Sequence, residues 1–132
     1  MKKQLDMLLD CHKAFESFYR DQMQADLPEE VVTLRKRLMD EEVSEWARCF
    51  SEDINLSESE QKRHRAKELA DILYVVFGTI VSEGLQDDME RVFEEVHNSN
   101  MSKLENGKPL KREDGKFMKG KNYKEPDLSF IQ

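Results

Sequence analysis

Two pairs of acidic residues, each separated by one helical turn, are the residues of this chain best suited to chemistry. The first pair is Glu42 and Glu45, and the second pair is Glu68 and Asp71. Residues three positions apart lie on one face of an α-helix, so each pair presents its two carboxylates together. We call these four residues the carboxylate quartet, because they converge if the two helices pack against each other.

The neighbours of both pairs are apolar. At about 100° per residue, one apolar arc of the first helix contains Glu42 and has Glu45 at its edge. That arc consists of Leu38, Met39, Val43, Trp46, Cys49 and Phe50. The segment that carries Glu68 and Asp71 is apolar almost all round, and such helices are normally buried. The quartet is therefore expected where a core should form, although solvated acids are the alternative in a chain with 37% charged residues.

A buried group of four acids should attract protons or cations. Two like charges about 5 Å apart repel by roughly 3 kcal/mol at an effective dielectric constant near 20. Oxygen ligands without a nearby His or Cys suit Mg²⁺ or Mn²⁺ better than Zn²⁺. Helical di-iron proteins use Glu-x-x-His pairs, whereas Asp71 occupies the position of that histidine here. The quartet therefore favours Mg²⁺.

The pattern E-x-x-E followed by E-x-x-D resembles the MazG-like all-α nucleoside triphosphate pyrophosphohydrolases over residues 34–103, and Glu41 supplies a doubled Glu common in these enzymes. The resemblance implies that the quartet binds Mg²⁺, with Mn²⁺ as a substitute. It implies conversion of a (d)NTP to the (d)NMP and pyrophosphate, which would clear the nucleotide pool. Glu41 and Glu42 are the expected catalytic residues, and a homodimer or dimer of dimers is expected.

Several other residues are candidates for substrate contacts. They are His12, Trp46, Asn98, Asn100, Lys103, Lys119, Lys121 and Tyr123. The alternative roles are packing for His12 and Trp46, helix capping for the asparagines, and solvated lysines in the tail. Two other functions stay open: a phosphoribosyl-ATP pyrophosphohydrolase-like enzyme, or a non-catalytic helical protein that binds metal or nucleotide.

Helical periodicity predicts four helices that position these residues, near 3–23, 28–50 and 57–83, with a fourth, shorter helix near 89–96 that Asn98, Asn100 and Lys103 follow. Ser57 and Glu60 form a capping-box pattern at the third helix, and Gly84 is expected to end it. The predicted fold is an all-α four-helix bundle with an irregular basic C-terminal tail. Residues 1–104 are expected to form the pyrophosphohydrolase domain, and residues 105–132 its tail.

Charge is distributed unevenly along the 132 residues. The net charge is −7, with eight basic and five acidic residues in 103–132, so that segment carries +3 and the rest −10. The acidic body disfavours nucleic acid as a partner. The tail segment Gly115–Lys121 fits part of a phosphate-binding loop, but Asn122 replaces the required Ser or Thr and no apolar strand precedes it. Flexible lysines closing over a triphosphate remain an option.

No signal peptide or membrane span is expected from the chain. The longest apolar run, residues 69–81, contains Asp71 and is shorter than the roughly 17 to 25 residues that cross a bilayer. Cys11 and Cys49 show no disulfide or metal spacing. A cytoplasmic protein with reduced thiols and no membrane partner is therefore expected.

Overall fold

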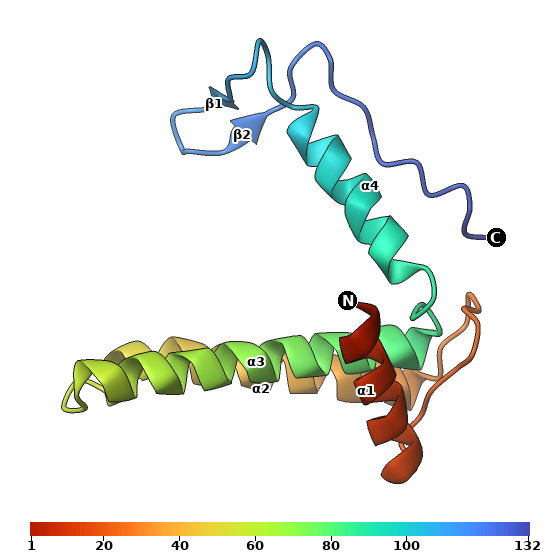
Figure 1. The fold of residues 1–132 in the computed structure, drawn as a ribbon, viewed down its shortest axis with the longest axis vertical. Helices are drawn as coiled ribbons and strands as arrows, with labels where there is room; N and C mark the ends of the chain where they lie inside the picture. Colours follow the sequence, from red (N-terminus) through yellow and green to blue (C-terminus); the bar gives the residue numbers. More distant parts are fainter. The chain divides into compact units, whose positions relative to one another are not determined.

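The computed structural model describes residues 1–132, and the all-α fold class predicted from the sequence is confirmed. The elements are α1 (Lys2–Ala14), α2 (Glu29–Glu52), α3 (Glu58–Glu83), α4 (Met89–Met101), β1 (Leu110–Lys111) and β2 (Phe117–Met118) (Figure 1). The chain folds as two compact units, residues 1–86 and 87–132. A domain boundary at residue 104 stays a prediction. None of the helices combines the length and the hydrophobicity of a membrane span.

In the first unit, α2 and α3 lie side by side as an antiparallel helical hairpin (Figure 1). Pro28 precedes α2, and acidic side chains in the first turn face the positive end of the helix dipole. The capping box of α3 is confirmed: the Ser57 hydroxyl accepts from the Glu60 N–H at 3.2 Å, and the Glu60 carboxylate accepts from the Ser57 N–H at 2.9 Å. Gly84 ends α3 with a φ of 77°. These local signals define the two helices that carry the quartet.

The first helix is shorter than its periodicity predicts. It ends at Ala14 rather than near residue 23, and Phe15 is 78% exposed. The Ser17 N–H donates to the His12 carbonyl at 2.8 Å, which closes the last turn. The following segment then hydrogen-bonds to the end of α3 through Arg20, whose N–H donates to the Val81 carbonyl at 3.2 Å. Long-range bonding therefore overrides the apolar stripe.

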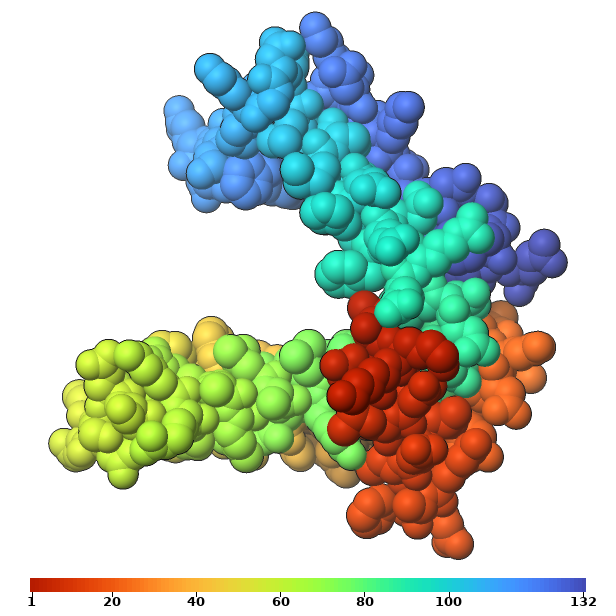
Figure 2. Space-filling model, in the orientation of Figure 1, coloured from red at the N-terminus to blue at the C-terminus, as the bar shows by residue number.

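A buried arginine joins α2 to α3. The Arg35 Nε donates to the Thr79 hydroxyl at 3.1 Å, and its Nη2 donates to the Val75 carbonyl at 2.9 Å. Gly78 makes room for this contact, because a Cβ there would lie 2.6 Å from Arg35 Nη2 and 3.0 Å from His12 Nε2. In Figure 2, α1 covers the adjoining part of α3. The hydrogen bonds of Arg35 therefore join α2 to α3 at the end of the hairpin where α1 packs on α3.

In the second unit, the C-terminal tail is attached to α4. β1 and β2 form a short antiparallel hairpin that the sequence did not predict. Further along, the Lys124 N–H donates to the Ser102 hydroxyl at 2.9 Å, and the Arg91 guanidinium lies 3.8 Å from the centre of the Phe130 ring. The tail is therefore more than a solvated spacer, because it packs along its own helix.

Candidate metal centre

The structure brings the carboxylate quartet together. One carboxylate oxygen from each of the four residues lies within 4.8 Å of the other three. Two of the acids come from α2 and two from α3, so the site exists only when these helices pack against each other. Glu68 is only 4% exposed, while the other three are partly buried. The convergence expected from the spacing is thus present.

Two oxygens of the quartet are buried without a hydrogen-bond partner. They are the Oε2 atoms of Glu42 and Glu68. Burial raises the pKa of the Glu42 carboxyl above its ordinary value, and the other three carboxylates raise it further. An unpaired buried carboxylate oxygen is costly, and a bound cation would remove that cost. The donor set is all oxygen, which fits a hard cation such as Mg²⁺.

Lys67 supplies positive charge to one side of the quartet. Its ammonium lies 2.6 Å from Asp71 Oδ2 and 3.1 Å from Glu68 Oε1. These contacts raise the Lys67 pKa, mainly through the hydrogen bond to Asp71. Glu42 and Glu45 have no comparable cation in contact. The negative charge of the quartet is therefore least compensated on the α2 side.

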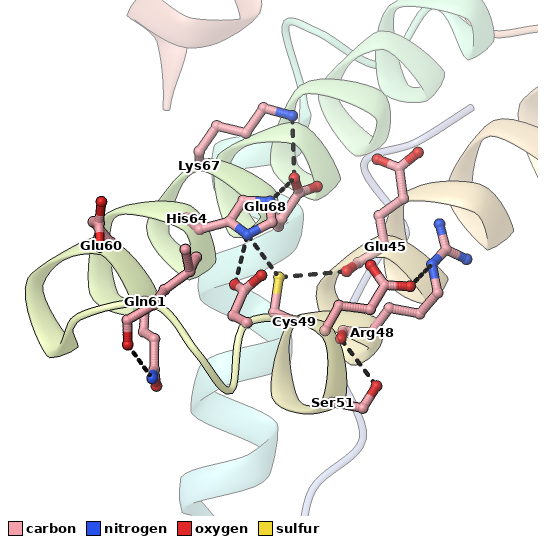
Figure 3. Close-up of polar contacts among 12 residues, drawn as sticks. Glu45, Arg48, Cys49, Ser51, Glu60, Gln61, His64, Lys67 and Glu68 are labelled. Atoms are coloured by element: carbon pink, nitrogen blue, oxygen red, sulfur yellow. Dashed lines mark hydrogen bonds and ion pairs between the residues drawn. The ribbon is translucent and has the colours of Figure 1, made fainter.

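A histidine and a cysteine lie beside the quartet, contrary to the expectation of a purely oxygen environment. Figure 3 shows His64 between Cys49 and Glu68. The His64 Nε2 is 3.1 Å from Glu68 Oε1, and its Nδ1 is 2.6 Å from Asp53 Oδ2 and 3.7 Å from Cys49 Sγ. No motif joins these residues, because a loop separates them. The i,i+4 spacings of Cys49 to Asp53 and of His64 to Glu68 were the available local signals.

Comparison with known proteins assigns the family. The sequence profile of phosphoribosyl-ATP pyrophosphohydrolases matches residues 8–100. The chain belongs to this family. It is therefore a pyrophosphohydrolase, a hydrolase that acts on a phosphoric anhydride of a nucleotide substrate. No curated protein matches the chain at a significant level. The matched residues of this phosphoribosyl-ATP pyrophosphohydrolase family member include the whole quartet.

The other candidate residues of the first unit have partners of their own. Glu41 lies outside the group of converging carboxylates and pairs with Arg37 at 3.7 Å. Trp46 makes an edge-on contact with Phe50, with 5.3 Å between ring centres. His12 is buried, and its Nδ1 is 2.8 Å from the Phe18 carbonyl. Burial lowers the pKa of His12. The catalytic role of Glu41 and the substrate roles of Trp46 and His12 stay predictions for this member of the family.

The remaining candidates lie in the second unit. Asn98 and Asn100 lie within α4 rather than after it, because the helix continues to Met101. Both are exposed, and their carbonyls accept hydrogen bonds from the residues that follow the helix. Lys119 lies 4.5 Å from the centre of the Tyr123 ring, and Lys121 is 3.7 Å from Glu105. A hollow of about 520 Å³ is lined by Lys103, Arg112, Lys116, Phe117, Met118 and Lys119. Sequence reasoning missed Arg112 and Lys116 as members of this basic group, because the hairpin brings them together.

Proposed function

We propose that this protein is a Mg²⁺-dependent nucleoside triphosphate pyrophosphohydrolase that converts a (d)NTP to the (d)NMP and pyrophosphate. The observation that carries the proposal is the convergence of the quartet, with two buried carboxylate oxygens left unpaired. Such an arrangement suits a hard cation, and a polyphosphate substrate needs one. Removal of nucleotides from the cellular pool is the role that we propose for this activity.

The residues of the chain would divide the work between metal and substrate. Glu42, Glu45, Glu68 and Asp71 would hold Mg²⁺, which supplies charge neutralisation of the triphosphate and activation of water when bound. Mn²⁺ offers similar coordination and is expected to substitute. The Glu42 carboxyl, whose pKa is raised above its ordinary value by burial and by the neighbouring carboxylates, would accept a proton more readily than an ordinary carboxylate. Glu41 would orient the attacking water.

We assign the basic residues of the C-terminal tail to contacts with the pyrophosphate leaving group. Lys103 and Lys119 line the hollow of the second unit, and Lys121 extends the same cationic segment. Positive charge near a departing pyrophosphate stabilises the transition state. We assign Asn98, Asn100 and Tyr123 to contacts with the sugar or base of the nucleotide.

Phosphoribosyl-ATP is the second candidate substrate, and the family match favours it as strongly as a (d)NTP. Both substrates carry a triphosphate chain, and cleavage between the α- and β-phosphates releases pyrophosphate from each. The quartet therefore serves either reaction equally well. The two candidate substrates differ in the group that the protein must recognise at the base. Assignment of the protein to the MazG-like group depends on the same difference.

We propose a homodimer or dimer of dimers, and exposed apolar residues of α3 support this proposal. Leu69, Leu73 and Tyr74 are each about half exposed. Apolar side chains at i, i+4 and i+5 form a continuous strip, and burial of such a strip against a second copy would stabilise the protein. Multi-angle light scattering would measure the mass in solution.

The deciding experiment is a substrate panel. Purified protein would be incubated with each dNTP, each NTP and phosphoribosyl-ATP, with Mg²⁺ or with EDTA, and the products resolved by ion-exchange chromatography. We expect the wild-type protein to form monophosphate and pyrophosphate in the reactions with Mg²⁺ but not in those with EDTA. The Glu45→Gln variant should lose most of this activity. The control is Glu52→Gln, which removes an exposed acid of the same helix that pairs with Arg48 at 3.5 Å. Equal turnover in wild type and Glu45→Gln would refute the proposed site.

A further inference from the structure

A second group of metal-ligating side chains lies at the loop end of the α2–α3 hairpin. Cys49 lies in the last turn of α2, Asp53 directly follows that helix, and His64 comes from the second turn of α3. One ligand atom from each of these three residues lies within 4.8 Å of the other two. Cys49 and Asp53 are 4% and 7% exposed. A sulfur, an oxygen and a nitrogen donor therefore converge, with the first two on buried residues and the third on a His64 side chain that is 40% exposed.

Both ring nitrogens of His64 face a carboxylate. The Nε2 is 3.1 Å from Glu68 Oε1, where an Nε2–H would donate to that oxygen, and the Nδ1 is 2.6 Å from Asp53 Oδ2. The Nδ1 also faces Cys49. Metal-bound histidines usually donate their other ring N–H to a carboxylate, which fixes the ring and strengthens the ligand. The outer contact of a metal-binding histidine is thus already present, independently of the three donors.

The spacing of the donors suits a tetrahedral ion. Bond lengths of about 2.3 Å to sulfur and about 2.0 Å to nitrogen place the two ligand atoms roughly 3.5 Å apart at a tetrahedral angle. The Cys49 Sγ to His64 Nδ1 distance is 3.7 Å. The Nδ1 to Asp53 Oδ2 distance of 2.6 Å is that of a hydrogen bond, so this pair would open by about 0.7 Å when an ion replaces the shared proton.

We propose that Cys49, Asp53 and His64 form a site for Zn²⁺ or another thiophilic divalent cation, separate from the carboxylate quartet. Thiolate and imidazole donors favour Zn²⁺ over Mg²⁺, which takes oxygen ligands. Binding releases the Cys49 thiol proton and the Nδ1 proton to solvent, so the affinity rises with pH. Three protein ligands leave the fourth position for water or a small anion.

The two sites share one structural link. His64 would bind the thiophilic ion through Nδ1 while its Nε2–H continues to hold Glu68, an acid of the quartet. An ion bound by Cys49, Asp53 and His64 would therefore fix the orientation of Glu68, while Mg²⁺ could still bind to the carboxylate quartet. The occupancy of one site is coupled to the geometry of the other through a single imidazole ring.

Cobalt titration of the whole protein tests this proposal without reference to catalysis. Co²⁺ bound to a thiolate gives a charge-transfer absorption in the near ultraviolet, and we expect this absorption to saturate at one equivalent. Zn²⁺ should abolish it, whereas excess Mg²⁺ should leave it unchanged. No absorption in the wild-type protein, or displacement by Mg²⁺, would overturn the proposal.

Matched variants identify the ligands. Cys49→Ser and His64→Asn should lose the absorption, and Asp53→Asn should weaken Co²⁺ binding at least tenfold. Cys11→Ser removes the other free cysteine, and Glu45→Gln removes an acid of the quartet, so both should retain the absorption. Circular dichroism would verify that each variant keeps its helices. Absorption that persists in Cys49→Ser, or that disappears in Cys11→Ser, would contradict the assignment.

Discussion

Glu42→Gln should stabilise the metal-free protein while it weakens metal binding. The substitution keeps the shape of the side chain but removes one charge from four carboxylates whose oxygens lie within 4.8 Å of one another. Repulsion between two charges about 5 Å apart is roughly 3 kcal/mol at an effective dielectric constant of 20. Partial exposure and the Lys67 ammonium reduce this value, so we expect a net gain of about 1 kcal/mol. For a chain of this length, that gain corresponds to roughly 2 to 4 °C in melting temperature.

The pH dependence of that gain has a definite sign. The pKa of Glu42 is raised in the folded protein, so the folded state binds more protons than the unfolded state above the ordinary value of 4.5. The contribution of Glu42 to stability is therefore fully present below pH 4.5 and is lost as the pH rises through the folded pKa. The advantage of Glu42→Gln over wild type should accordingly be largest near neutral pH and disappear in acid.

Thermal unfolding in EDTA and in millimolar Mg²⁺, followed by circular dichroism, measures both effects. In EDTA the variant should melt above wild type. Mg²⁺ should then raise the melting temperature of wild type more than that of the variant, because a ligand stabilises the state that binds it. Glu41→Gln is the matched control, since Glu41 is exposed and lies outside the group. A variant no more stable than wild type in EDTA at pH 7 would refute the argument from repulsion.

Three further outcomes are expected. The wild-type protein should lose stability relative to His12→Asn as the pH falls below about 6.5. Burial lowers the pKa of His12 in the folded state, so only the unfolded state gains a proton at that pH. Denaturant titration at several pH values measures this loss, and His97→Asn is the control at an exposed histidine. Gly78→Ala should destabilise the protein by about 1 to 3 kcal/mol in the same assay, since its Cβ would meet the Arg35 guanidinium at 2.6 Å. Truncation after Glu105 should raise KM or lower kcat for a triphosphate substrate while circular dichroism still shows folded helices; unchanged kinetics and unchanged mass would exclude the tail as either a lid or a dimer contact.

Local sequence signals predict the helical hairpin well. The capping box at Ser57 and the left-handed Gly84 define the ends of α3 without reference to the rest of the protein. Each carboxylate pair follows from its spacing, because its two acids lie within one helical turn, whereas the convergence of the two pairs requires α2 to pack against α3. Short-range rules succeed here since both the helix ends and the carboxylate pairs depend on neighbours in the chain.

Long-range contacts account for what the sequence did not reveal. α1 ends early because Arg20 and the segment around it bond to the end of α3, which no periodicity records. Strands of two residues, such as β1 and β2, are too short to show alternation. Cys49 and His64 meet across the α2–α3 loop, so their proximity depends on the register of two helices rather than on any local pattern.

Arg35 also sets the register of α2 against α3. The Arg35 guanidinium donates to both the Val75 carbonyl and the Thr79 hydroxyl, and these two hydrogen bonds favour a single alignment of α2 along α3. Glu42 follows Arg35 by seven residues and Glu68 precedes Val75 by seven, a distance of about 10 Å along each helix. Because α2 and α3 are antiparallel and the two separations along the helices are equal, Glu42 and Glu68 lie opposite each other. An error of one turn at Arg35 would shift the two carboxylate pairs about 5 Å out of alignment, so the precision of the acidic site is set by a cation two turns away.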